Sequence, residues 1–105
     1  MDYRKPKVLK VKKAKLIDNS KNRIFVFDLK DSTKEIKVDE SLNRIKSRML
    51  EVMKSKRNRV YLSYGMSNID IDYLGDNKWQ LFDELDVYIF DINVKENDEN
   101  EFWRI

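Results

Sequence analysis

The sequence contains neither cysteine nor histidine. Without cysteine the chain can form no disulfide, no thiolate zinc site and no cysteine nucleophile, which is typical of proteins in a reducing compartment. Without histidine it lacks the commonest general base and the imidazole ligand of metal ions. These two absences exclude the most frequent catalytic and metal-binding arrangements.

Glycine and proline are also scarce, with two glycines and one proline among 105 residues. Such low numbers argue against a low-complexity chain, and they exclude a glycine-rich loop that would hold a phosphate group. The serines occur in neither a Ser-x-x-Lys nor a Gly-x-Ser-x-Gly pattern, so nucleophilic serine chemistry has no support. We therefore expect no enzymatic activity and no cofactor.

Long apolar runs are missing as well. The start of the chain has no apolar segment typical of a signal peptide, and the runs at residues 24–27 and 87–90 are far too short to cross a bilayer. We expect a cytoplasmic protein with no membrane partner. The length predicts a single domain over residues 1–95, followed by an acidic and aromatic tail over residues 96–105.

Charge is abundant, and it is divided unequally along the chain. Residues 1–60 contain 19 lysines and arginines against 8 acidic residues, whereas residues 61–105 contain 3 against 11. The first part therefore carries a net charge of +11 and the second −8, although the whole chain carries only +3. Such an asymmetry indicates charged partners. The alternative is that the two parts face each other in the fold and neutralise one another.

Apolar and polar residues alternate along the chain both before and after one stretch with helical periodicity. Residues 7–17 predict a long first strand whose alternation changes parity at Lys12 and Lys13, which indicates a β-bulge there. The alternation predicts further strands at residues 23–30, 35–38, 60–64, 68–74, 78–82 and 87–94. The Gly-Asp-Asn sequence at residues 75–77 predicts a hairpin turn.

One amphipathic helix is predicted at about residues 40–56, with Asp39 or Ser41 as its cap. Its apolar stripe consists of Leu42, Ile45, Met49, Val52 and Met53. The predicted fold class is α+β, with a mostly antiparallel sheet or half-open barrel of about six or seven strands and the helix inserted after the third strand. This order of elements resembles that of an OB-type barrel, which has its helix between the third and fourth strands.

Two acidic patterns resemble metal sites. Residues 35–37 (Glu-Ile-Lys), preceded by Asp28 or Asp18, match the spacing in nucleases where two carboxylates hold Mg²⁺ and a lysine steadies the attacking water. Glutamate and lysine are abundant in this chain, so the pattern favours an exposed edge strand. Asp70 and Asp72 share one strand face, but a metal site needs further ligands. We expect no catalytic and no metal-binding residues.

The basic residues of the first strand and of the helix form one candidate binding surface. Lysine and arginine side chains on one surface contact phosphates. The bulge predicted in the first strand would bring its four central lysines onto the solvent face. The residues that we expect to contact nucleic acid or an acidic partner are Lys10, Lys12, Lys13, Lys15, Arg44 and Arg48.

The acidic second half supplies the other candidate surface. Carboxylates on a small protein can occupy a basic DNA or RNA channel in the place of phosphates. The residues that we expect to bind a protein partner in this way are Asp70, Asp72, Asp83, Glu84 and Asp86. In the acidic tail, Phe102 and Trp103 either form a docking peptide or fold back onto the body, because large aromatic side chains are costly to expose.

These observations favour a small non-enzymatic binding protein that docks by charge complementarity on a nucleic-acid-handling protein or nucleoprotein complex and blocks it. Small size and abundant Lys, Asn, Asp and Ile are typical of phage or mobile-element proteins that inhibit host defence. The alternative is a direct nucleic-acid-binding module, single-stranded and OB-like, that uses the stripe from Lys10 to Lys15. An assembly subunit with merely solubilising charges and the Mg²⁺ nuclease are further alternatives. The sequence leaves the partner's identity and the oligomeric state undefined.

Overall fold

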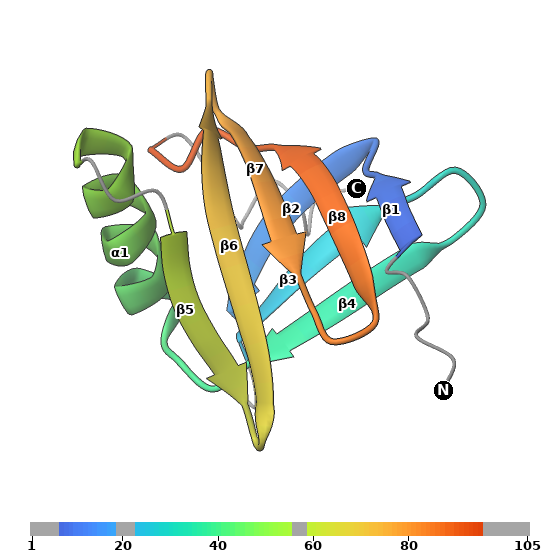
Figure 1. Cartoon of the computed structure of the whole chain (residues 1–105), viewed down its shortest axis with the longest axis horizontal. Coiled ribbons are helices and arrows are strands. Elements are labelled where there is room, and N and C mark those ends of the chain that lie inside the picture. Colours follow the sequence, from blue (N-terminus) through green and yellow to red (C-terminus); the bar gives the residue numbers. More distant parts are fainter. Residues whose placement is uncertain (1–6, 19–22, 56–58, 96–105) are drawn as a thin grey trace, which may run out of the picture.

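The computed structural model describes residues 7–18, 23–55 and 59–95 (Figure 1). These residues form, in chain order, β1 (Lys7–Lys10), β2 (Lys13–Asp18), β3 (Arg23–Asp28), β4 (Thr33–Val38), α1 (Leu42–Lys54), β5 (Arg59–Tyr64), β6 (Ser67–Gly75), β7 (Lys78–Phe82) and β8 (Asp86–Asp91). The predicted α+β class is confirmed. The described residues form eight strands rather than six or seven because the predicted first strand is divided in two, so the helix follows the fourth strand.

The strands form two sheets. The front sheet has the order β1-β8-β7-β6-β5, and the back sheet has the order β2-β3-β4. Neighbouring strands are antiparallel except β1 and β8, which are parallel. In Figure 1 the front sheet lies over the back sheet, and α1 lies at one side next to β5. Within the described residues the two sheets do not close into a barrel, so the half-open alternative is the nearer one.

The first strand is divided where the chain passes from one sheet to the other. The Val11 N–H donates to the Ile89 carbonyl of the front sheet at 3.0 Å, and the Lys12 N–H donates to the Asp28 carbonyl of the back sheet at 2.7 Å. The inward side chains on both sides of this point all pack in the main core: Leu9, Val11, Ala14 and Leu16. The predicted β-bulge within one long strand is therefore wrong, because the change of parity accompanies a passage from one sheet to the other.

Helix α1 is held by its cap and by its apolar stripe. The Ser41 side chain accepts a hydrogen bond from the Arg44 N–H at 3.2 Å, so Ser41 is the N-cap. The Asp39 carboxylate instead accepts from the Gly65 N–H at 2.6 Å, which joins the β4–α1 loop to the β5–β6 hairpin. The buried residues of the stripe are Leu42, Ile45 and Met49.

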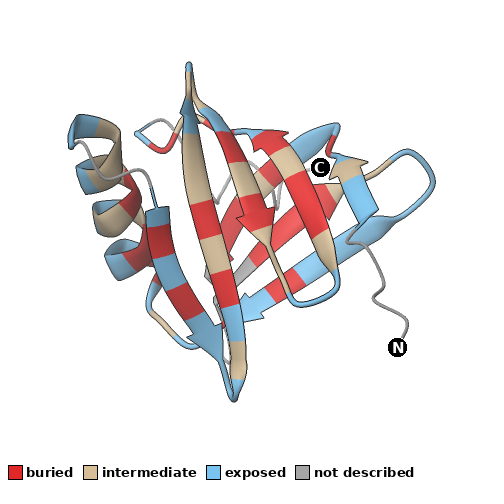
Figure 2. Ribbon diagram, viewed as in Figure 1, coloured by how far each residue is buried: buried red, intermediate tan, exposed pale blue. Residues whose placement is uncertain are grey.

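The inner faces of the two sheets pack around aromatic side chains. The ring centroid of Phe27 in the back sheet lies 5.3 Å from that of Tyr88 in the front sheet. Trp79 is fully buried, its ring centroid lies 4.5 Å from that of Tyr73, and its Nε1 donates to the Ile92 carbonyl at 3.3 Å. Figure 2 shows buried residues alternating with more exposed ones along the front strands, which is the pattern of a sheet covered on one face.

The backbone angles at two hairpin turns identify the types of turn. Gly65 has a φ of +59° at the first central position between Tyr64 and Ser67, which defines a type II′ turn. Asp76 and Asn77 both have positive φ, 51° and 61°, which defines a type I′ turn between β6 and β7. The hairpin predicted at the second of these turns is confirmed.

Tyr88 makes the fold sensitive to alkaline pH. Burial first, and then the nearby charges of Asp83 and Asp86, raise the pKa of Tyr88 from 10.0 to about 12. This contribution to stability is complete below the unfolded pKa of about 10, and it is lost as the pH rises through the folded value. We expect the free energy of unfolding to fall by about 2–3 kcal/mol across that interval on account of Tyr88.

Denaturant unfolding of the wild type and of Tyr88→Phe at a series of pH values between about 9 and 12 measures this effect. The phenylalanine variant retains the ring and lacks the titrating group, so its stability should fall less steeply. Equal pH dependence in the two proteins would contradict the assignment to Tyr88.

Candidate protein-interaction surface

The outward side chains of the front sheet form one continuous surface, the front face. Its members are Val8, Lys10, Arg59, Tyr61, Asp70, Asp72, Gln80, Phe82, Val87 and Ile89. They alternate along the strands with the residues that pack in the main core. In Figure 1 no described helix or strand lies in front of β5, β6, β7 and β8.

The strand pairing arranges the front face in rows. The first row, in spatial order from β5 to β1, is Tyr61, Asp70, Phe82, Val87 and Val8. Tyr61 at one end is 63% exposed and Val8 at the other is 64% exposed, whereas Phe82 is half-buried between them. Tyrosine and phenylalanine are enriched at protein interfaces, where a few large side chains contribute most of the binding energy. This row therefore has the composition of a docking surface.

Arg59 organises the second row, which is Arg59, Asp72, Gln80, Ile89 and Lys10. Its guanidinium donates from Nε and NH2 to both oxygens of Asp72, at 2.6 and 2.8 Å, and its NH1 lies 3.8 Å from Asp70. Its central carbon lies 5.4 Å from the centroid of the Phe82 ring. These contacts, the hydrogen bonds to Asp72 above all, raise the pKa of Arg59. Arg59 therefore places a positive charge between the carboxylates of Asp70 and Asp72.

The β7–β8 loop adds acidic residues to the same end of the front face. The Oδ1 atom of Asp83 accepts from the N–H groups of Leu85 and Asp86, at 2.7 and 2.6 Å, which fixes the loop. Asp70 pairs with Phe82, the residue before Asp83, so strand and loop carboxylates are neighbours. Of the acidic residues predicted to bind a partner, Asp70 and Asp72 lie on the front face, whereas Asp83 and Glu84 line the groove beside β4. Asp86 alternates with Val87, so its side chain lies on the inner side of β8. Arg59 neutralises part of the charge of Asp70 and Asp72.

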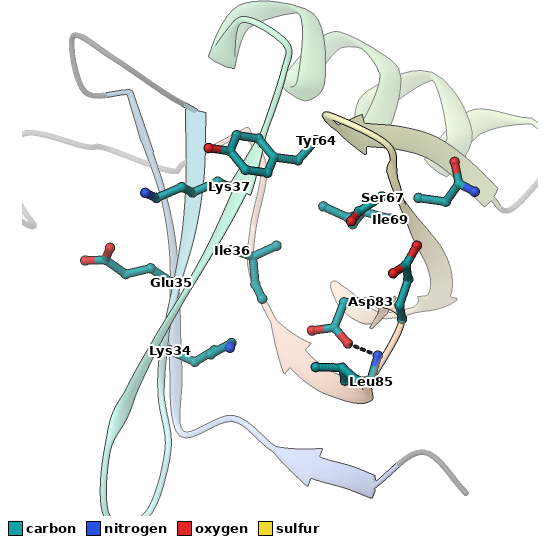
Figure 3. Close-up of a pocket in the computed structure, with 11 residues that line it drawn as sticks. Lys34, Glu35, Ile36, Lys37, Tyr64, Ser67, Ile69, Asp83 and Leu85 are labelled. Carbon is teal, nitrogen blue, oxygen red and sulfur yellow. Dashed lines mark hydrogen bonds between the residues drawn. The ribbon is translucent and has the colours of Figure 1, made fainter. Parts of the chain in front are cut away.

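An open groove of about 310 Å³ adjoins this loop (Figure 3). It is lined by residues 34–37 of β4, by the β5–β6 hairpin around Tyr64 and Ile69, and by residues 83–85. Figure 3 shows Ile36 pointing into the space between β4 and the loops. Leu85 on the opposite wall is 59% exposed, so the groove offers an apolar surface beside the carboxylates.

The predicted lysines gather around the crossing between the sheets, on more than one face. Lys10 belongs to the front face, whereas Lys13 and Lys15 point outward from the back sheet. Lys12, at the crossing itself, lines a depression of about 330 Å³ with Lys10 and Lys30. It also lines a second depression, of about 300 Å³, with Lys13 and Lys15. The change of sheet at Val11 and Lys12 therefore divides the stripe.

Arg44 and Arg48 belong to helix α1 and contact residues outside it. Both pair with Glu40, Arg44 through Nε at 3.0 Å and Arg48 through NH1 at 2.8 Å. Arg48 also donates from NH2 to the Tyr61 carbonyl at 2.7 Å, which joins α1 to β5. This hydrogen bond gives Arg48 a role in positioning the strand that carries Tyr61.

The remaining candidate residues form no further site within the described ranges. Glu35 and Lys37 are exposed on the edge strand β4. Among all the residues that the structure describes, no three acidic residues lie close enough to hold a metal ion. The one helix described, α1, is neither long nor apolar enough to cross a membrane. Phe102 and Trp103 lie outside the described residues.

Arg59, Tyr61 and Phe82 of the front face were not selected from the sequence. The alternation over residues 59–64 was the available signal, because it places Arg59 and Tyr61 opposite the buried Val60 and Leu62. No family model, curated protein or solved structure matches the chain. Its function is therefore inferred from the surface.

Proposed function

We propose that the protein is a non-enzymatic binding protein that docks on a nucleic-acid-handling protein and blocks it. The observation that carries the proposal is the front face, in which exposed Tyr61 and half-buried Phe82 lie on either side of Asp70. Large rigid side chains of this kind form the energetic centre of protein interfaces. The front face supplies them on a sheet that the core holds rigid.

The charge around these aromatic residues favours a basic partner surface. Asp70 stands beside Phe82 in the row, Asp83 and Glu84 follow Phe82 in the chain, and Arg59 pairs only with Asp70 and Asp72. Complementary charge steers association and selects the partner. Proteins that bind nucleic acid present basic grooves to phosphates. A carboxylate-bearing face that enters such a groove would exclude the nucleic acid.

The structure sharpens the choice of variants for testing this proposal. Replacing Asp72 by a basic residue would break its ion pair with Arg59, and replacing Asp83 would remove the hydrogen bonds that fix the loop. A loss of binding in either variant could then result from altered folding. Asp70 and Glu84 offer charge reversal with fewer lost contacts, because Glu84 is exposed and Asp70 only approaches Arg59 at 3.8 Å. Asp31 is an exposed acidic residue in the β3–β4 turn and provides the matched control.

The test begins with affinity capture from the native host by the full chain, followed by a nucleic-acid-binding assay of the captured protein. We expect a stoichiometric partner whose nucleic-acid binding the full chain inhibits. Asp70→Lys and Glu84→Lys should each weaken the complex by roughly tenfold, whereas Asp31→Lys should leave it unchanged. A captured partner with no nucleic-acid function, or equal affinity of all three variants, would overturn the proposal.

A direct nucleic-acid-binding role is the second candidate, and the lysines around the sheet crossing favour it. Lys12 borders both depressions there, so a phosphate backbone in either one would meet several ammonium groups. In this case the isolated protein should bind oligonucleotides, and its affinity should fall steeply with salt. Lys12→Glu together with Lys13→Glu should abolish that binding. Absence of binding at low salt would remove this candidate.

A further inference from the structure

Strand β4 forms an outer edge of the back sheet, where it pairs only with β3 among the described strands. Directly after β4, the Asp39 N–H donates to the Ser63 carbonyl of β5 at 2.8 Å, on the side away from β3. Because backbone groups alternate in direction along a strand, the N–H and C=O groups of Thr33, Glu35 and Lys37 face this same side. The pairing of β3 with β2 and with β4 gives the same alternation. Within the described ranges, no strand pairs with this side of β4.

The other outer strands present less open backbone. In β5 the Tyr61 carbonyl accepts from Arg48 at 2.7 Å and the Ser63 carbonyl accepts from Asp39, so that edge is partly occupied. Strand β1 has four residues, and β2 contacts α1 and β8. An outer strand with unpaired N–H and C=O groups is a template for pairing with another chain. Among the described outer strands, β4 therefore offers the most open template for a further strand.

The side chains of β4 alternate in direction. Figure 3 shows Glu35 and Lys37 pointing to one side of the strand, and Lys34 and Ile36 to the other, toward the groove. Glu35 and Lys37 are both exposed, and they carry opposite charges two positions apart on the same face. An antiparallel copy of the strand would present these two charges in the reverse order. The edge is therefore complementary in charge to itself.

We propose that β4 pairs with β4 of a second copy of the chain, antiparallel and about a two-fold axis at Ile36. Glu35 then stands opposite the second copy's Lys37, and Lys37 stands opposite its Glu35. The backbone groups of both residues face the shared edge, so each pair exchanges both of its backbone hydrogen bonds. The two three-stranded back sheets become one continuous sheet. This inference does not depend on the function proposed for the front face.

Charge selects this register over its neighbours. The outward backbone groups must face one another, so the second strand can shift only in steps of two residues relative to the first. One such step places Glu35 opposite the second copy's Glu35, and a step the other way places Lys37 opposite its Lys37. Like charges directly opposite one another destabilise a strand pair, whereas opposite charges stabilise it. The proposed register pairs both charged residues of each chain.

The groove beside β4 provides apolar surface for the added strand. Leu85 and Tyr64, which line this groove of about 310 Å³ together with Ile36, are 59% and 39% exposed. The second copy's Ile36 would lie opposite Ile36, on the side of the strand that faces the groove. Burial of apolar surface there favours the dimer. The front face belongs to the other sheet, so it stays available to a partner.

Sedimentation equilibrium of the full chain over a range of concentrations measures the dimerisation constants of wild type and variants. We expect Glu35→Lys and Lys37→Glu each to weaken the wild-type dimer at least about tenfold, because each change places like charges opposite one another at both symmetric positions. An equal mixture of the two variants restores both pairs, so it should form a heterodimer about as stable as the wild-type dimer. Lys54→Glu makes the same change of charge at the last residue of α1 and is the matched control, which should dimerise like wild type.

A proline variant separates backbone pairing from charge. The Glu35 N–H faces the open edge, so Glu35→Pro removes a donor of the proposed pair and leaves the hydrogen bonds to β3 in place. This variant should be monomeric and have the circular dichroism spectrum of the wild type. If it unfolds, the mixture of the two charge-reversal variants decides.

A wild type that stays monomeric at millimolar concentration would overturn the inference. So would a dimer that both charge reversals leave unchanged, because it would use another surface, and so would a mixture that forms no heterodimer. If the wild type is monomeric and Glu35→Pro abolishes capture of a partner protein, a strand of that partner occupies the edge of β4 instead of a second copy, which also overturns the inference.

Discussion

Replacing Trp79 by alanine is expected to lower the free energy of unfolding by about 3–5 kcal/mol, a large fraction of the stability of a domain of this size. Trp79 is fully buried in β7, where its ring contacts Tyr73 and its Nε1 donates a hydrogen bond to the Ile92 carbonyl. Alanine would leave a cavity, an aromatic ring without its neighbour and a buried carbonyl without its donor. Chemical denaturation followed by circular dichroism measures the change.

Trp79→Phe is the matched control because it retains a ring and removes the donor. Its cost should be about 1–2 kcal/mol, which is the range for a lost buried hydrogen bond with slight underpacking. Leu74→Ala, at a half-exposed position on the neighbouring strand, should cost less than either. If Trp79→Ala cost no more than Leu74→Ala, the described packing of β7 would be wrong.

Tyr61→Ala is expected to weaken the complex with the captured partner roughly 30-fold, or about 2 kcal/mol, without unfolding the protein. The side chain is 63% exposed on the front face, so its removal leaves no cavity in the core. Its neighbour across the sheet is Asp70, which places an amphipathic ring beside the carboxylate proposed to face the basic partner. Titration of the partner with wild type and variant gives the two dissociation constants.

Two variants define what a loss of affinity at Tyr61 would mean. Tyr61→Phe retains the ring, so it should bind within a few-fold of wild type if apolar contact dominates. Leu74→Ala removes a half-exposed apolar side chain near the β6–β7 turn and should leave affinity unchanged. Equal binding of wild type and Tyr61→Ala would exclude the first row of the front face as the interface centre.

Local patterns in the sequence were sufficient for the elements and for much of the core. The alternation over residues 87–94 predicted that Tyr88, Phe90, Ile92 and Val94 share one face, and all four are buried in the main core. The helical stripe correctly identified α1, which extends from Leu42 to Lys54 within the predicted range. Such patterns report which side of an element is apolar, because side-chain direction follows from the backbone period alone.

Strand pairing was less accessible from the sequence. The change of parity at Lys12 was visible, but a bulge within one sheet and a passage between two sheets have the same local pattern. Hydrogen bonds from Val11 to β8 and from Lys12 to β3 distinguish them, and β8 lies far away in the chain. The same limit applies to the lysines, because their division between faces follows from that passage.

For the candidate surface, the sequence identified charge more readily than contacts. Of the acidic residues predicted to bind a partner, Asp70 and Asp72 share the front face, whereas Asp83 and Glu84 line the groove beside β4. The partial neutralisation of Asp70 and Asp72 by Arg59 depends on which residue of β5 stands opposite Asp72. Arg44 and Arg48 were predicted for a basic surface from their charge, and the sequence did not show that both pair with Glu40.

The parallel pairing of β1 with β8 also sets an order of events during synthesis. Lys7 stands opposite Asp86, so this pair joins residues 79 positions apart. At a translation rate of about 5–20 residues per second, β1 exists for about 4–16 s before its partner strand has been made. The β2–β3–β4 and β5–β6–β7 hairpin units can form earlier because their pairings are local. The front sheet is therefore completed last, when β8 pairs with β1, which was synthesised long before it.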